Sequence, residues 1–160
     1  MGSSSSKLEN PNLFSCTFKK IYGNPSVIGI DDKLDWKITR ISLYQVPINT
    51  LAHITKTAHY YLIFDVCSND NDNQGFILSH FTVDGTKHLE FHKSKSQAIF
   101  TSFEQIYLTS KVELLRFWDT NEKFVRNLKE SFDEWNKPFN LVLSNCRKFT
   151  RFIVKRLGLL

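Results

Sequence analysis

The residue with the clearest chemical potential is Cys146, which follows Asn145 at the start of a helical pattern. From Cys146 to Leu157, apolar residues recur at helical spacing, and Gly158 follows, as is typical just past a helix end. The first NH groups of a helix are unpaired and lie at the positive end of its dipole, and both effects favour a thiolate over a thiol. The pattern therefore predicts a nucleophilic cysteine.

A cysteine nucleophile needs a general base to take its proton, and His59 is the candidate. His59 begins the strongest strand pattern of the chain, residues 59–66, so its position along a strand is well defined. His53, which lies upstream, is the rival candidate for the same role.

A third group must orient the base, and the sequence offers His80 for that role. The polar stretch at 68–73 separates the first strand from a second one at 76–83, which predicts a hairpin. A turn centred between Asp70 and Asn71 places residue 82 opposite His59, so His59 and His80 become diagonal neighbours on one face. We expect the cysteine helix to pack against that face. A register error of one residue would move His80 to the other face.

The rest of the sequence predicts the elements that position these residues. The pattern changes to helical spacing at 119–135, where Asp119 and Glu122 fit a capping box and Pro138 a stop. We predict an α+β fold in which an antiparallel β-meander packs against two C-terminal helices, the last carrying Cys146 at its N-terminus. We expect residues 1–12 to form a flexible tail and residues 13–160 to form a single catalytic-type domain. Further strand patterns occur at 13–18, 27–30, 36–46, 87–92, 111–118 and 100–108, the last of which also fits a short helix.

Composition narrows the class of protein. A chain of 160 residues with 41% apolar content can bury a core without disulfides or metals. Its three cysteines form an odd set without a CxxC spacing, which favours free thiols and a cytoplasmic protein. The net charge of +5 is spread along the chain, so nucleic acid is an unlikely partner on this ground. No apolar run reaches the roughly 18 residues needed to span a bilayer.

Two features leave a peripheral membrane contact open. Gly2 and Ser6 fit the myristoylation pattern, although the same residues resemble an expression leader. The last helical segment carries a cluster of cations that is either a solvated face or a contact for anionic lipid or nucleic acid. The cluster comprises Arg147, Lys148, Arg151, Lys155 and Arg156.

Metal and cofactor sites are not expected. His88 and His92 share one strand face but have no cysteine pair or third ligand nearby, so a zinc site is unlikely. The stretch from Asp70 to Gly75 imitates the start of a calcium loop, yet Phe81 stands where the terminal Glu is needed, which favours a hairpin turn. No phosphate loop is present.

The His-strand, the β-meander and the late apolar-x-Asn-Cys-x-x-Phe helix together resemble the circularly permuted papain-like superfamily, over roughly His59 to Leu157. That superfamily includes PPPDE peptidases, lecithin:retinol acyltransferase-like enzymes and NlpC-type peptidases. The resemblance implies that Cys146 is the nucleophile, His59 the base and His80 the orienting group. Two departures are Tyr60-Tyr61, where many relatives have a small residue, and Lys148, where many have His.

The resemblance implies a thiol-dependent hydrolase that forms an acyl-thioenzyme, with peptide or isopeptide bonds as the first choice of substrate. The partner would then be a protein or peptide, including a ubiquitin-like one. A lipid acyltransferase or phospholipase of the same fold is the second choice. Outside this class, a catalytically inactive protein-binding module and a basic nucleic-acid-binding module remain as alternatives.

Overall fold

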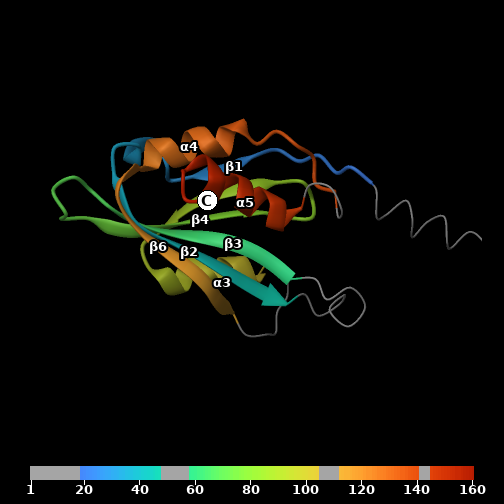
Figure 1. Ribbon diagram of the computed structural model, residues 1–160, viewed down its shortest axis with the longest axis horizontal. Coiled ribbons are helices and arrows are strands. Elements are labelled where there is room, and N and C mark those ends of the chain that lie inside the picture. Colours follow the sequence, from blue (N-terminus) through green and yellow to red (C-terminus); the bar gives the residue numbers. More distant parts are fainter. Residues whose placement is uncertain (1–18, 48–57, 105–111, 141–144) are drawn as a thin grey trace, which may run out of the picture.

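The computed structural model describes residues 19–47, 58–104, 112–140 and 145–160, which form an α+β fold (Figure 1). In these ranges six strands build one mixed sheet. The strands are β1 (Ser26–Ile28), β2 (Lys37–Pro47), β3 (Ala58–Cys67), β4 (Gln74–Phe81), β5 (Lys87–His92) and β6 (Glu113–Phe124). The helices are α3 (Lys95–Glu104), α4 (Val125–Glu134) and α5 (Cys146–Arg156), with a short 3-10 turn at Asp31–Lys33.

The strand order is β1-β5-β4-β3-β2-β6, and only β1 runs parallel to its neighbour among the described strands. The prediction of a wholly antiparallel meander is therefore wrong at this edge. Val27 of β1 pairs with Leu89 of β5 in a parallel ladder. After β1 the chain passes through the short 3-10 turn and enters β2, which is separated from β1 by three strands. The strand expected at 13–18 lies outside the described residues.

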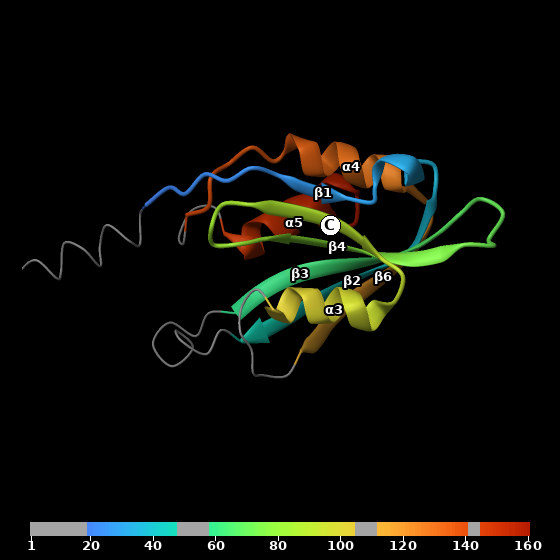
Figure 2. The ribbon, with the colours of Figure 1, turned by 180° about the vertical axis from the view of Figure 1, so that it is seen from behind.

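The helices cover both faces of the sheet, with α4 and α5 on one face and α3 on the other (Figures 1 and 2). Strand β3 is apolar on both faces, because Leu62 and Phe64 join the core under α4 and α5. Tyr61 and Ile63 join a smaller core that includes Ala98 of α3. This alternation decides which side chains can meet the cysteine helix.

The β3–β4 hairpin has the predicted register. Leu62 pairs with Ser79 and Cys67 with Gln74, which centres the turn between Asp70 and Asn71. Asn71 has a φ of 64°, a conformation that Asn tolerates better than most residues. The stretch that imitates a calcium loop is thus a hairpin turn, as expected.

The predicted helix at 119–135 starts too early. Residues 119–124 complete β6, where Asp119 accepts a 2.8 Å hydrogen bond from Arg40 of the neighbouring strand β2. The expected capping box at Asp119 and Glu122 is therefore wrong, and the helix begins at Val125. Its first turn is closed instead by the amide of Phe124, which donates to the Asn127 side chain at 2.9 Å.

The segment at 100–108 had two interpretations, and the helical one is correct as far as the structure describes it. Helix α3 runs from Lys95 to Glu104 and covers the face of β4 and β5. Residues 105–108 lie outside the described part of the chain. The protein therefore has a third helix, which the two-helix prediction lacked.

Candidate functional site

Cys146 occupies the first position of α5, as predicted. The side-chain oxygen of Asn145 accepts a 3.0 Å hydrogen bond from the amide of Lys148, which is the geometry of an N-cap. The helix then buries one stripe formed by Cys146, Phe149, Ile153 and Leu157 against the sheet. The Asn-Cys pair thus combines a capping residue with a thiol that points inward, and Cys146 is only 8% exposed.

The thiol of Cys146 meets backbone rather than an imidazole. Its Sγ donates to the carbonyl oxygen of Ala58 at 3.7 Å, at the start of β3. Burial raises the pKa of Cys146, while the backbone NH groups of Tyr60, Arg147 and Cys146 itself oppose that rise. In this conformation desolvation outweighs the NH groups, so the sulfur is a protonated thiol at neutral pH.

His59 and His80 form the predicted pair. Nε2 of His59 lies 3.0 Å from Nδ1 of His80, so one ring donates a proton and the other accepts it. Burial lowers the pKa of His59 to about 4, with the nearby His88 as a second cause. Burial also lowers the pKa of His80 well below its ordinary value, helped by His59 and His88. Both imidazoles are therefore neutral at pH 7.

The histidine pair and the cysteine lie on opposite faces of the sheet. The His59 ring stacks on Tyr61 at 5.9 Å, and Tyr61 belongs to the core under α3. Helix α5 covers the other face, where the hydroxyl of Thr150 donates to the backbone oxygen of Tyr60 at 3.5 Å. The expectation that His59 and His80 face the cysteine helix is therefore wrong. Among the described residues, no imidazole lies within hydrogen-bonding distance of the sulfur.

The sulfur of Cys146 nevertheless contacts the segment of β3 that carries His59. Ala58, whose carbonyl accepts from the thiol, directly precedes His59. The pairing of β3 with β4 begins at Leu62, whereas β2 already pairs with β3 from Ala58 onward. The start of β3 is thus held by one neighbouring strand, with the thiol beside its backbone.

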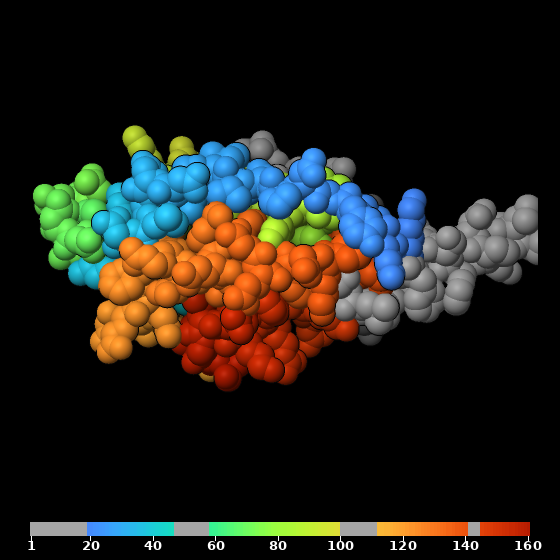
Figure 3. All heavy atoms as spheres, turned by 90° about the horizontal axis from the view of Figure 1, so that it is seen from above, coloured from blue at the N-terminus to red at the C-terminus, as the bar shows by residue number. Residues whose placement is uncertain are grey.

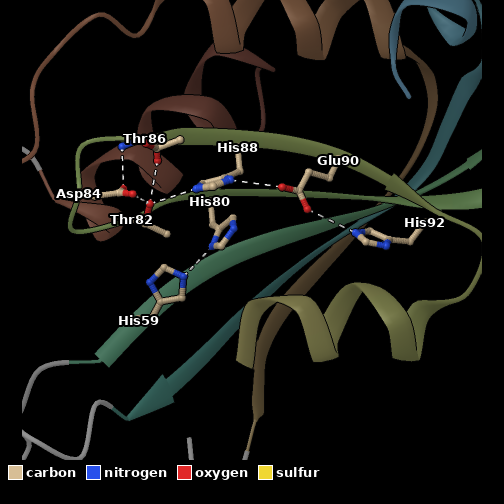
Figure 4. A network of polar contacts seen from close by, with 8 residues as sticks. All are labelled: His59, His80, Thr82, Asp84, Thr86, His88, Glu90 and His92. Carbon is tan, nitrogen blue, oxygen red and sulfur yellow. Dashed lines mark hydrogen bonds and ion pairs between the residues drawn. The ribbon is translucent and has the colours of Figure 1, made fainter. Parts of the chain in front are cut away.

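The histidine pair belongs to a longer row of polar side chains across β3, β4 and β5 (Figure 4). The His80 and His88 rings lie 4.5 Å apart, and Nδ1 of His88 is 3.2 Å from a carboxylate oxygen of Glu90. His92 lies 3.6 Å from the other oxygen of Glu90. The i, i+2 spacing of His88, Glu90 and His92 is visible in the sequence, but their link through one carboxylate was not anticipated.

His88 is joined through Thr82 to a second carboxylate, that of Asp84. Nε2 of His88 lies 3.0 Å from the hydroxyl of Thr82, and that hydroxyl is 2.6 Å from a carboxylate oxygen of Asp84. Asp84 is ionised, because hydrogen bonds from Thr82 and Thr86 more than offset its burial and lower its pKa. Thr82 thus links Asp84 to His88, and Glu90 contacts the other ring nitrogen of His88.

The described residues hold no group of three or more His, Cys, Asp or Glu side chains arranged for a metal ion. His88 and His92 share Glu90 rather than converging on one point. The described cysteines, Cys67 and Cys146, are both buried and free. His53 and Cys16 lie outside the described residues.

Comparison of the chain with protein-family models, with curated proteins and with solved structures found no significant match in any of the three. Within the described ranges, no helix combines the length and the apolar character that crossing a membrane requires.

Proposed function

We propose that this protein is a thiol-dependent hydrolase with Cys146 as its nucleophile, built on a permuted papain-like arrangement. The observation that carries the proposal is the position of the sulfur. It lies at the Asn-capped start of α5, with backbone NH groups directed at it and with the segment of His59 in contact. Those NH groups are the part of the site that favours negative charge on the sulfur or on a substrate oxygen.

The reaction would proceed through an acyl-thioenzyme. An imidazole takes the thiol proton, and the thiolate of Cys146 attacks the carbonyl carbon to give a tetrahedral oxyanion. The amide of Cys146 at the helix start stabilises that oxyanion. The leaving amine departs with the proton from the imidazolium, and water then attacks the thioester to release the acid and restore the thiol.

The base must reach the sulfur for this reaction, and two histidines are candidates. His59 lies on the same strand segment as Ala58, whose carbonyl contacts the thiol, but its ring lies on the α3 face. The first residues of β3 pair with β2 but not with β4. A shift of this segment by one residue would turn the His59 ring toward α5. His53 precedes the strand and is the second candidate. The described conformation is accordingly the resting form, in which the thiol is protonated.

Peptide or isopeptide bonds are the proposed substrates, and lipid esters or thioesters are the second choice. The test is covalent labelling of the full chain by three electrophilic probes: a ubiquitin-like protein with a C-terminal electrophile, a fluorophosphonate and an electrophilic acyl lipid. Labelling by the first probe, lost in Cys146→Ala and retained in Cys67→Ala, supports the proposal. His59→Ala and His53→Ala then identify the base, since the variant that lacks it loses labelling while remaining folded.

A catalytically inactive binding module is the second candidate, and the opposite-face placement of His59 and His80 favours it. This alternative predicts no labelling by any of the three probes, in the wild type as in Cys146→Ala. It also predicts that a peptide partner binds both chains with equal affinity. Labelling that persists in Cys146→Ala would contradict the hydrolase proposal directly.

A further inference from the structure

The exposed side of α5 carries a stripe of four cations, Arg147, Lys148, Arg151 and Lys155, which we call the α5 basic stripe. At about 100° per residue, these side chains fall within an arc of about 100° on the helix. All of them are exposed, and α5 itself contains no acidic residue. The helix lies at the surface beside α4 (Figure 3).

The charges of the stripe are not balanced by the described residues. Arg156, on the neighbouring side of the same helix, pairs with Glu134 of α4, and Lys129 pairs with Asp133 within α4. By contrast, no ion pair joins a member of the stripe to an acidic residue in the part of the chain that the structure describes. Arg147 instead lies over the ring of Tyr60, at 5.7 Å.

This arrangement is unfavourable for the helix alone. Arg147 and Arg151 are four residues apart, as are Arg151 and Lys155, and like charges at that spacing repel. Arg147 and Lys148 also stand in the first turn, where the helix dipole disfavours cations. Stability of the fold therefore does not explain the stripe, whereas an anionic partner would remove both penalties.

We propose that the α5 basic stripe docks the protein on an anionic lipid bilayer. One straight row of cations on a convex helix suits contact with a charged plane, and long basic side chains can reach the headgroups. The exposed apolar residue that follows the helix is Leu160, an aliphatic side chain, while the exposed aromatics Tyr22 and Phe117 lie on other elements. An exposed aliphatic side chain after the helix suits a lipid interface, whereas single-stranded nucleic acid is bound by stacking on exposed aromatics.

This proposal is independent of the hydrolase proposal, because none of its contacts involves the sulfur of Cys146. Gly2 fits the acylation pattern, and an acyl chain there would add a second membrane signal to the stripe. The stripe is expected to bind without it, though less tightly.

The test is co-sedimentation of the unacylated full chain with vesicles of phosphatidylcholine, with and without phosphatidylserine. The wild type should bind the mixed vesicles, and this binding should weaken as the salt concentration rises. It should not bind vesicles of phosphatidylcholine alone, which carry no net charge. Arg151→Gln/Lys155→Gln should weaken binding about thirty-fold, since each basic residue near such a surface contributes about 1 kcal/mol. Cys146→Ala should bind like the wild type.

The matched control is Lys93→Gln/Arg126→Gln, which removes the same charge from two exposed positions, one directly after β5 and one on α4. The affinity of this control for the mixed vesicles should stay within about twofold of the wild type, because Lys93 and Arg126 lie outside the α5 basic stripe. Arg147→Gln/Lys148→Gln provides a second test of the stripe, and circular dichroism checks that each variant is folded. Equal weakening by the stripe and control variants would overturn the proposal, as would binding to an oligonucleotide duplex without binding to the mixed vesicles.

Discussion

Nε2 of His59 and Nδ1 of His80 lie 3.0 Å apart, and both rings are buried on the face of the sheet that carries α3. Burial lowers the pKa of both rings, and the nearby His88 lowers it further, so both are neutral at pH 7. A buried neutral pair makes the fold sensitive to acid, because the unfolded chain takes up protons at a higher pH than the folded one.

The first prediction concerns stability against pH. The pKa of His59 is lowered to about 4 in the folded state. The neutral ring therefore contributes its full share of the folding stability above the pKa of histidine in the unfolded chain, and this share is lost as pH falls. Linkage for this residue alone predicts a loss of about 2 kcal/mol in the free energy of unfolding between about pH 7 and 5. Urea denaturation at a series of pH values measures it.

The control for this experiment is His59→Leu/His80→Leu, which removes both buried titrating groups and keeps an apolar core. Its unfolding free energy should vary less steeply with pH over the same window. Identical slopes in the wild type and the double variant would show that the pair does not titrate as described.

The second prediction concerns the thiol of Cys146 in the free protein. Because burial raises its pKa, alkylation by iodoacetamide should be slower than that of a free thiol at neutral pH. The rate should still be rising above about pH 10.5, where an ordinary thiol has already reached its plateau. A Cys16→Ala/Cys67→Ala chain isolates the signal of Cys146. A plateau reached below about pH 7 would instead reveal a thiolate in the resting form.

The β3–β4 register could be predicted from the sequence, whereas the side of the sheet on which Cys146 lies could not. The polar run around Asp70 and Asn71 fixes the centre of the turn, and the turn fixes which residues oppose each other. In β3, however, Tyr61, Leu62 and Ile63 are all buried, so both faces of the strand carry core residues. Nothing in such a strand indicates which face will receive the cysteine helix.

The other errors have similar causes. Asp119 fits a helix N-terminus by type, but its pairing with Arg40 on β2 holds it in β6, and that contact is tertiary. The parallel pairing of Val27 with Leu89 likewise depends on a long-range crossover. By contrast, the buried stripe of α5 could be predicted from the spacing of its apolar residues, because an amphipathic helix that packs on a single core buries its apolar side.

The third prediction tests the cap of α5. Asn145 accepts from the amide of Lys148, so Asn145→Ala leaves that group unpaired and should lower the free energy of unfolding by about 1 kcal/mol. Asn145→Asp retains an acceptor and should be close to the wild type in stability. Urea denaturation compares the three proteins. An alanine variant as stable as the aspartate variant would show that the cap does not stabilise the helix.

The fourth prediction tests the packing of Gly75 against Phe91, on adjacent strands. A Cβ built on Gly75 would lie 2.2 Å from the Phe91 ring, and that ring also packs edge-on against Trp36 at 5.8 Å. Because Trp36 packs against the ring and the backbone oxygen of His92 would lie 3.1 Å from the new Cβ, Gly75→Ala should lower the free energy of unfolding by about 1–3 kcal/mol through overpacking. Thermal or urea denaturation of the full chain measures the loss.

A double variant separates this cause from a general effect of replacing a strand glycine. Phe91→Leu shortens the side chain that the new methyl group meets, so Gly75→Ala should cost less in that background than in the wild type. The difference between the two costs is the coupling energy of the pair, and overpacking predicts that it exceeds about 0.5 kcal/mol. Additive losses would mean that the ring of Phe91 moves aside freely, in which case its contact with Trp36 does not hold it in place.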